Sequence, residues 1–486
     1  MKAEPPNTLY WHDYETWGEV PAQDRPSQFA GVRTDEDLNI IGEPMMIYCR
    51  PAPDCLPKPE ACLITGLLPQ VALEKGLPEA EFVARIIAEL GAPGTCGVGF
   101  NSIRFDDEVT RYALYRNFYD PYEREWRNGN SRWDIIDVVR MTRALRPEGI
   151  EWPNYEDGRP CFKLEMLTAA NHLAHESAHD ALSDVYATIA IAKLIKNRQP
   201  KLYDYAYRLR DKRFAASMID IAAHKPLLHI SSRFPSEQGN AALVLPLALH
   251  PSNKNAVIAY NLSMSPQDLL TLSVDELRLR LFTRTEALPE GITRLALKEI
   301  HLNKSPMLLP PNMLDDKTAQ RLQIDKALCE QHWQQLANLG HVERDRLQQT
   351  LFALYSEPTF AEKTDPEQML YSGFFSEQDK KLMLQIRRLS PQALAETAFN
   401  FKDPRLPEML FRYRARNFPQ TLSDVERQQW RVFCQSRLSD ANAGGGLILT
   451  EFQSRISALL AAPETSAAQK TLLEKLQDYA LGLQQQ

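Results

Sequence analysis

The sequence predicts three successive structural types: an α/β segment, a β-rich segment and a helical segment. Short apolar runs alternate with helical periodicity over residues 8–197. Short β-like runs separated by proline, asparagine and serine follow over residues 198–353, and helix-start signals dominate residues 355–486. A chain of 486 residues exceeds what one hydrophobic core usually organises, so we expect these segments to be separate domains.

The first segment contains three strand candidates and two helix candidates. Residues 9–14, 45–48 and 96–100 are short runs typical of strands. Residues 106–119 and 184–196 have helical periodicity, and Pro200 blocks further extension of the second helix. This mixture predicts an α/β domain.

The second segment carries β-like runs with helical insertions. The runs are residues 227–230, 242–245, 256–260 and 295–301, and the insertions are residues 275–281 and 318–337. A small β-rich domain is the simplest interpretation.

The third segment shows helix caps. Ser376 with Asp379, and Ser423 with Glu426, have the spacing of capping boxes, and Ser390 precedes a proline as an N-cap should. Three glycines at 444–446 predict a flexible break, and residues 469–483 predict a terminal amphipathic helix.

Composition excludes several classes of protein. With 44% apolar and 24% charged residues, the chain is typical of a globular protein and not of a disordered one. No run approaches the eighteen apolar residues of a membrane span, and residues 1–8 lack the apolar core of a signal peptide, which predicts a cytoplasmic protein. The seven cysteines are scattered and never spaced C-x-x-C, which favours reduced thiols over disulfides or a zinc site.

Two acids in the first strand candidate are spaced for a shared site. Asp13 and Glu15 lie two positions apart, so both carboxylates face the same side of a strand. Thr16 and Gly18 follow where the strand should end and the backbone could approach a ligand. Two solvated acids would give the same pattern, but the apolar and aromatic neighbours indicate a buried strand.

Two further motifs supply acids and a histidine. Asp106 follows the strand candidate at 96–100 and opens a helix, where it could instead complement the helix dipole. His179 precedes Asp184 by five positions, and Asp184 stands at a helix start where it could be a simple cap. Ligands with oxygen alone select hard ions such as Mg²⁺ or Mn²⁺. Two carboxylates ~4 Å apart repel by about 4 kcal/mol at an effective dielectric near 20, so convergence of the four acids would imply bound cations.

The stretch from residue 104 to residue 146 has the composition of a surface for single-stranded nucleic acid. It holds nine arginines against eight acids, a local charge of +1 in a chain of −7, and eight aromatic residues. Arginine suits phosphates, and aromatic rings suit unpaired bases. Trp126 could instead be a core residue. Residues 205–214 and 411–418 are further basic-aromatic stretches, whose alternative is domain packing.

The three acidic motifs, in this order, resemble the DEDDh group of 3′→5′ exonucleases. Seven blocks that span nearly the whole chain resemble the bacterial exodeoxyribonuclease I family: residues 12–16, 104–111, 116–122, 131–134, 145–149, 178–181 and 413–419. The resemblance implies a ribonuclease-H-like exonuclease domain, an SH3-like β-rich domain and a C-terminal α-helical domain.

The resemblance also implies roles for individual residues. Asp13, Glu15, Asp106 and Asp184 would hold two Mg²⁺ ions, which Mn²⁺ could replace, and His179 would be the general base. Contacts to the strand would come from Glu15, Thr16, Lys163, Arg111, Tyr122, Trp126, Arg140 and Arg146. Lys163 stands where we expect an arginine in the family. It would therefore contact a phosphate through one ammonium group and not through a bidentate guanidinium.

The expected reaction is processive, stepwise hydrolysis of single-stranded DNA from the 3′ end to 5′-mononucleotides, in DNA repair and recombination. The resemblance implies docking of the acidic C-terminal tail of single-stranded-DNA-binding protein, and we expect a monomer without membrane contact. Because the predicted metal ligands all lie in the first segment, removal of residues from about 355 onward should leave some cleavage of short oligonucleotides.

Three alternatives stay open at this point. His172, His175 and the His179–Asp180 dipeptide are compatible with an HD-type metal phosphohydrolase, which would not need Asp13. A single-strand binding module without catalysis would need only the basic-aromatic stretches. An RNA exonuclease also stays open, because the sequence does not show whether the protein discriminates the 2′-hydroxyl.

Overall fold

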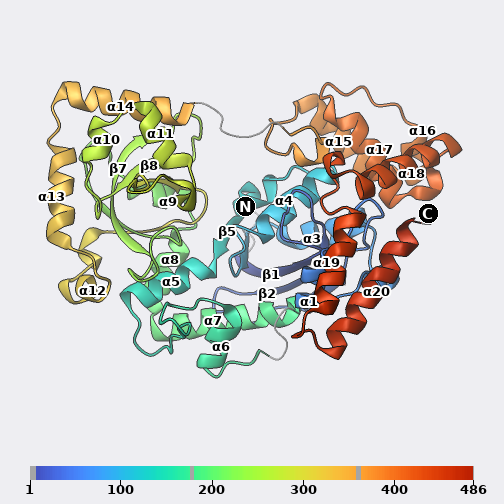
Figure 1. The fold of residues 1–486 in the computed structure, drawn as a ribbon, viewed down its shortest axis with the longest axis horizontal. Coiled ribbons are helices and arrows are strands. Elements are labelled where there is room, and N and C mark those ends of the chain that lie inside the picture. The colour runs from blue at the N-terminus through green and yellow to red at the C-terminus, as the bar shows by residue number, and fades with distance from the viewer. Residues whose placement is uncertain (1–6, 176–179, 357–362, 485–486) are drawn as a thin grey trace, which may run out of the picture. The chain divides into compact units, whose positions relative to one another are not determined.

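The computed structural model describes residues 7–175, 180–356 and 363–484, and the chain forms two compact units (Figure 1). One unit joins Met1–Ser131, His175–Ile189 and Glu362–Gln486, and the other joins Arg132–Ala174 and Ala190–Ala361. The C-terminal helical segment thus belongs to the same unit as the N-terminal strands. Among the described residues, none of the helices combines the length and the hydropathy needed to cross a membrane.

The first sheet has the strand order β3-β2-β1-β4-β5. The strands are β1 (Thr8–Thr16), β2 (Pro26–Thr34), β3 (Met45–Tyr48), β4 (Thr95–Gly99) and β5 (Ser131–Asp134). β1 pairs with β2 antiparallel and with β4 parallel, and β2 pairs with β3 antiparallel. The strands predicted at 9–14, 45–48 and 96–100 are therefore confirmed, and the strand that carries Asp13 and Glu15 is the centre of the sheet.

β2 and β5 are strands that the sequence pattern did not predict. β2 begins with a proline and contains Ser27, Gln28 and Gly31, which interrupt any apolar alternation. Ser27 and Gln28 are nevertheless buried. A Cβ at Gly31 would overlap the ring of Tyr10 on the adjacent strand. Packing against β1, and not the apolar pattern, thus places β2.

The helices of the N-terminal part cover this sheet. They are α1 (Pro59–Thr65), α2 (Pro69–Lys75), α3 (Glu79–Leu90), α4 (Asp106–Arg116), the 3₁₀ turns η1 (Glu123–Glu125) and η2 (Arg127–Gly129), and α7 (Ala181–Arg198), which belongs to this unit up to Ile189. α3 and α4 share an apolar cluster with β1 and β2, which includes Tyr14, Phe29 and Phe82. α4 ends three residues earlier than predicted because Phe118 has a φ of 61°, which no right-handed helix can include.

The C-terminal segment is helical, as predicted. Its elements are η5 (Pro366–Gln368), α15 (Glu377–Arg388), α16 (Pro391–Glu396), α17 (Arg405–Asn417), η6 (Pro419–Thr421), α18 (Asp424–Ser439), η7 (Ala441–Ala443), α19 (Leu449–Ala461) and α20 (Ala467–Gln484). Ser376, Ser390 and Ser423 are N-caps whose side chains accept backbone hydrogen bonds, and the box at Ser423 and Glu426 is complete.

Two apolar clusters join the C-terminal helices to the N-terminal part, and Figure 1 shows the red and blue segments side by side. One contains Trp17 and Leu56 together with Phe452 of α19 and Leu476 of α20. The other contains Tyr115 and Phe118 together with residues of α15 and α17. The N-terminal segment therefore completes its core with residues more than 240 positions away in sequence.

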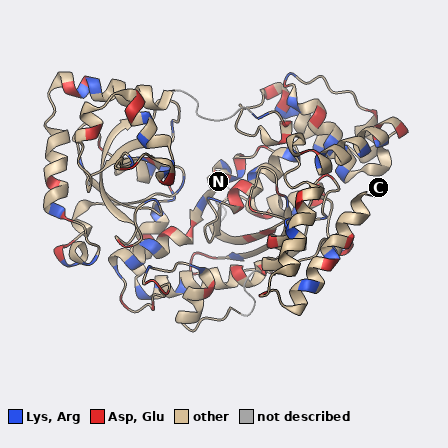
Figure 2. Cartoon of the chain, in the orientation of Figure 1, with Lys and Arg blue, Asp and Glu red and all other residues tan. Residues whose placement is uncertain are grey.

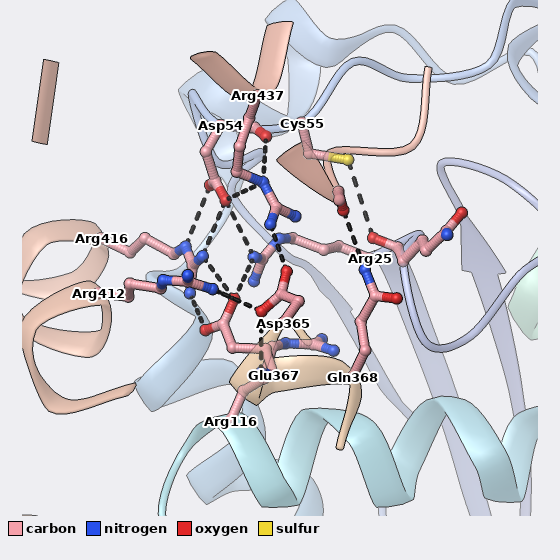
Figure 3. Close-up of polar contacts among 12 residues, drawn as sticks. Arg25, Asp54, Cys55, Arg116, Asp365, Glu367, Gln368, Arg412, Arg416 and Arg437 are labelled. Atoms are coloured by element: carbon pink, nitrogen blue, oxygen red, sulfur yellow. Dashed lines mark hydrogen bonds and ion pairs between the residues drawn. The ribbon is translucent and has the colours of Figure 1, made fainter. Parts of the chain in front are cut away.

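A buried ionic network reinforces this junction (Figure 3). Arg416 contacts Asp54 at 2.8 Å and also pairs with Glu367. The other members of the network are Arg25, Glu79, Arg116, Asp365, Arg412 and Arg437. Burial alone would raise the pKa of Asp54, but the guanidinium groups of Arg416 and Arg25 outweigh it and hold that pKa well below its usual range. The junction is thus charged as well as apolar.

The second unit is built on an antiparallel sheet with the order β10-β6-β7-β8-β9. Its strands are β6 (Leu227–Ile230), β7 (Ala241–Leu249), β8 (Ala256–Asn261), β9 (Leu297–His301) and β10 (Met307–Leu309). Its helices are α5 (Ile135–Leu145), α6 (Leu164–Ala170), α8 (Pro200–Arg208), α9 (Lys212–Ser217), α10 (Gln267–Thr271), α11 (Val274–Phe282), η3 (Thr285–Ala287), η4 (Pro311–Met313), α12 (Asp316–Arg321), α13 (Lys326–Ala337) and α14 (His341–Ser356). The four predicted β runs are confirmed.

The segment predicted to be helical at residues 318–337 is helical, but it is interrupted. The structure has two helices there, α12 and α13. Gln323 between them has a φ of 53°, which ends the first helix. Asp325 then caps the second helix by accepting a hydrogen bond from the backbone N–H of Leu328.

Candidate active site

Three carboxylates converge beside the central strand of the first sheet. Asp13 and Glu15 lie on β1, and Asp184 lies in the first turn of α7. One oxygen from each lies within 4.8 Å of the oxygens from the other two, and Asp13 and Asp184 are half-buried. Asp106, the first residue of α4, adjoins them, because its Oδ1 accepts a hydrogen bond of 3.1 Å from the backbone N–H of Tyr14.

The electrostatics of this cluster are those of a site for cations. Burial first, and then the charges of Asp106 and Glu15, raise the pKa of Asp13 well above its usual range. Burial and the neighbouring Asp184 and Asp106 raise the pKa of Glu15 to about 8. Both raised pKa values mean that the negative charges of these buried carboxylates repel one another, and a bound cation would offset this repulsion. An all-oxygen set of this kind fits Mg²⁺ or Mn²⁺.

Two neighbouring acids are engaged elsewhere. Asp107 accepts a hydrogen bond of 2.5 Å from Arg124 Nη2, and Asp180 accepts one from the backbone N–H of Ser183. The ion pair of Asp107 with Arg124 favours Asp106 as the ligand, and the position of Asp184 in the group with Asp13 and Glu15 favours it over Asp180.

His179 lies outside the described residues, so its predicted role as the base stays a prediction. The structure does place another histidine against the cluster: His175 Nε2 lies 2.5 Å from Asp184 Oδ1. From the sequence, His175 was a candidate only for the HD-type alternative. Its proximity to Asp184 depends on a chain path that no short motif reveals.

Three of the predicted DNA contacts in the first unit, Arg111, Tyr122 and Trp126, lie on α4 and the segment that follows, whereas Glu15 and Thr16 lie on β1. Arg111 is buried and binds Glu125 through Nε at 2.7 Å and Nη2 at 2.8 Å, and its guanidinium lies 5.3 Å from the ring centroid of Tyr122. Trp126 is 65% exposed, so the alternative of a core residue was wrong. Thr16 is buried and its hydroxyl donates to the carbonyl of Gly18.

Two exposed rings that the sequence analysis missed lie beside these contacts. Phe374 is 85% exposed, with its ring 5.9 Å from that of Tyr122, and Tyr371 accepts a hydrogen bond of 3.1 Å from Arg111. Phe374 and Tyr122 line a cavity of about 200 Å³ whose walls also include Arg127, Lys380 and Arg387. A Tyr-x-x-Phe pair in a serine- and glycine-containing loop was the only available signal.

The remaining predicted contacts lie in the second unit. Lys163 is exposed, with Nζ 3.9 Å from Glu165. Arg140 is buried and binds Asp137 at 2.6 Å. Arg146 lines a cavity of about 460 Å³ whose walls include Leu202, Tyr205 and Leu309. Figure 2 shows basic and acidic residues interspersed over both units, so the net charge of −7 says little about any one surface.

The arginines of residues 411–418 do not form a surface for binding a DNA strand. Arg412 binds Asp365 at 2.7 Å, Arg414 binds Glu426 at 2.7 Å, and Arg416 belongs to the buried network. The predicted alternative of domain packing is therefore the one that the structure shows, because these basic side chains compensate buried acids.

The fold and the acidic site define a nuclease hydrolase of the exonuclease class: the family model described as "Exonuclease" matches residues 10–192. Models described as "Exonuclease I SH3-like domain" and "Exonuclease I C-terminal domain" match residues 210–357 and 364–483. These matches confirm the predicted fold class.

The chain belongs to the exodeoxyribonuclease I family. It is 45% identical to exodeoxyribonuclease I of Haemophilus influenzae over 479 residues, which cover 98% of each chain. It is 47% identical to the Escherichia coli protein over 426 residues, which cover 87% of this chain and 88% of that protein. The HD-type phosphohydrolase and the binding module without catalysis are thereby excluded.

Comparison with solved structures supports the same family assignment. A moderately thermophilic exonuclease I from Methylocaldum szegediense has a TM-score of 0.93 and 49% identity, with 98% of this chain and 99% of that chain covered. The E. coli enzyme has been solved with a dA16 oligonucleotide, at a TM-score of 0.93 and 42% identity over 98% of this chain and 100% of that chain. A structure described as an ExoI/SSB-Ct complex matches at a TM-score of 0.91 and 42% identity over 99% of this chain and 100% of that chain.

Proposed function

We propose that this chain is a Mg²⁺-dependent 3′→5′ exonuclease that degrades single-stranded DNA stepwise to 5′-mononucleotides, in DNA repair and recombination. The observation that carries the proposal is the convergence of Asp13, Glu15 and Asp184 within 4.8 Å. The oligonucleotide complexes of the E. coli relative support single-stranded DNA as the substrate.

The chemistry follows from these side chains. Asp13, Glu15, Asp106 and Asp184 would hold divalent ions, which in this superfamily activate the attacking water and neutralise charge on the scissile phosphate. The raised pKa of Glu15, about 8, means that cation binding would displace a proton from the cluster near neutral pH. We propose from the sequence that His179 takes the proton of the attacking water, which suits an imidazole at that pH.

The test of this proposal is digestion of a single-stranded oligonucleotide labelled at its 5′ end or its 3′ end. We expect a ladder of shortening products from the 5′-labelled strand and immediate release of the label as a mononucleotide from the 3′-labelled strand. Chelation should stop both reactions, and Mg²⁺ should restore them. Duplex DNA and single-stranded RNA serve as comparison substrates. Equal digestion of RNA, or hydrolysis that persists with chelator, would contradict the proposal.

The exposed rings on one side of α4 are the proposed stacking surface for bases. Tyr122 and Tyr371 contact Arg111, and the ring of Phe374 lies 5.9 Å from that of Tyr122, which combines aromatic faces with a cation. Trp126 follows Glu125, which binds Arg111. Unpaired bases expose the faces that such rings require, whereas paired bases do not.

Trp126→Ala should weaken binding of a single strand by about 1–3 kcal/mol, the usual contribution of one stacked base. Because the ring is 65% exposed, the melting temperature should not change. Fluorescence anisotropy with a labelled oligothymidylate in chelator, together with thermal unfolding of the same preparation, measures both quantities. A lowered melting temperature with unchanged affinity would refute the stacking role.

We also propose that the cavity beside Arg146 receives the C-terminal tail of single-stranded-DNA-binding protein. A relative 42% identical to this chain has been solved as an ExoI/SSB-Ct complex. The cavity has apolar walls that include Leu202, Leu309 and Met313, and Arg146 and Lys201 supply positive charge. An acidic peptide with an apolar C-terminal residue would place its carboxylate on a cation and its side chain between these walls.

Arg146→Ala should weaken binding of an acidic tail peptide about tenfold or more, the usual effect of removing a charged hydrogen-bond donor. Affinity for oligothymidylate should not change, which separates this role from the strand contact predicted for Arg146. Peptide titrations of both proteins at two salt concentrations give the comparison. Equal peptide affinity for the variant and the wild type would remove this cavity as the docking site.

A further inference from the structure

The segment that carries Tyr122 and Trp126 is fastened to α4 by two ion pairs. Arg124 of η1 donates from Nη2 to Asp107 Oδ1 at 2.5 Å. The next residue, Glu125, binds Arg111 through both carboxylate oxygens, at 2.7 and 2.8 Å. Consecutive residues of a short 3₁₀ turn are thus bound to successive turns of one helix.

The first of these pairs is the more deeply buried. The side chain of Arg124 is 1% exposed and that of Asp107 is 3% exposed. Gly97 of β4 makes room for the guanidinium, since a Cβ there would lie 3.2 Å from Arg124 Nη1. A planar guanidinium held in a closed space has little freedom, so it fixes the backbone that carries it.

The two ends of this connection have different roles. Asp107 directly follows Asp106, the acid whose Oδ1 accepts the N–H of Tyr14 between Asp13 and Glu15. Arg124 lies two residues before Trp126, whose ring is exposed. One buried pair therefore lies between the carboxylate cluster and the proposed stacking surface.

We propose that Arg124 is a positioning residue: its ion pair with Asp107 holds Trp126 in place relative to α4, so that a strand stacked on Trp126 stays in register with the carboxylates. The inference rests on the proposed role of Trp126 in strand binding. Arg124 touches neither the strand nor the reacting atoms. It acts through the segment that it anchors.

The test is a double-mutant cycle between Arg124 and Trp126, read as affinity for a labelled oligothymidylate in the full-length protein with chelator present. Arg124→Met should weaken binding about fivefold in the wild-type background and less than about twofold in the Trp126→Ala background, as coupled residues do. Arg124→Lys should keep most of the affinity, because it keeps a cation beside Asp107. Arg85→Met removes the exposed pair with Glu81 and should change nothing.

Arg124→Met leaves Asp107 buried without this partner, so its stability must be measured together with its affinity. If it fails to fold, Arg124→Met combined with Asp107→Asn removes both charges and should fold, yet bind the strand as weakly as predicted for Arg124→Met. Wild-type affinity of that paired variant would overturn the proposal. Equal loss from Arg124→Met in both Trp126 backgrounds would overturn it too, while the stacking role stands. No loss from Trp126→Ala alone would remove the stacking role and this proposal with it.

Discussion

Replacing Asp13 by alanine should abolish hydrolysis of a labelled oligonucleotide while leaving the metal-free protein as stable as the wild type, or more stable. Asp13 carries one of the three converging carboxylates, and without it the cation site loses a ligand. The same substitution removes a charge that burial and the nearby Asp106 already disfavour. Repulsion between carboxylates ~4 Å apart is worth about 4 kcal/mol at an effective dielectric of 20, so part of that energy should be recovered.

Thermal unfolding with and without Mg²⁺ measures the second half of this prediction. Mg²⁺ should raise the melting temperature of the wild type, because an ion that binds only the folded state stabilises it, and should have little effect on Asp13→Ala. Asp184→Ala should behave in the same way, whereas Glu81→Ala, which removes an exposed acid of α3, should change neither activity nor the response to Mg²⁺. Substantial Mg²⁺-dependent turnover by Asp13→Ala would refute the metal assignment.

The same repulsion makes the stability of the metal-free wild type depend on pH, and the sign of this dependence follows from the pKa of Glu15. Folding raises the pKa of Glu15 from an ordinary 4.5 to about 8, so the folded protein binds this proton more tightly than the unfolded chain does. Stability should therefore fall as pH rises between these values, and Mg²⁺ should reduce the fall.

The residues of the site could be chosen from the sequence because their spacing is local. Asp13 and Glu15 share a strand face whatever the rest of the chain does, and Asp106 and Asp184 each stand at the start of a helix. Their convergence could not be derived in this way, since it depends on the parallel pairing of β1 with β4 and on the return of α7 to the sheet. Tyr371 and Phe374 were missed for the same reason, because only the C-terminal segment brings them to α4.

The fold could be predicted from the sequence where short-range signals determine the secondary structure. Serine caps marked α15, α16 and α18, and apolar runs marked β3 and β6. Strand β2 could not be predicted from the sequence, because its polar residues Ser27 and Gln28 are buried by tertiary packing. For the arginines of residues 411–418 the sequence left a DNA-binding surface and domain packing both open, because composition does not distinguish a cation that faces solvent from one that faces a buried acid.

The buried network gives the second large prediction: Arg416→Met should lower the free energy of unfolding by about 3–5 kcal/mol, the usual cost of breaking a buried ion pair. Arg416 is buried and contacts both Asp54 and Glu367. Its loss leaves Asp54, which is 0% exposed, with weaker partners at 3.4 Å from Arg25 and 3.6 Å from Arg437. Denaturant unfolding measures the difference, and Arg427→Met, which breaks an exposed pair on α18, should stay within about 0.5 kcal/mol of the wild type.

The same junction reverses the expectation that a chain cut at about residue 355 would still cleave short oligonucleotides. Such a cut removes Asp365, Glu367, Arg412, Arg416 and Arg437, and leaves Asp54 and Arg25 without these partners. It also exposes apolar residues such as Trp17, Leu56 and Tyr115, which pack against the C-terminal helices. The truncated chain should therefore aggregate or unfold without a cooperative transition, and should show no hydrolysis although it keeps the four acids. A monomeric truncated chain with a sharp unfolding transition and Mg²⁺-dependent cleavage would show that the network is dispensable, and that the N-terminal segment completes its core alone.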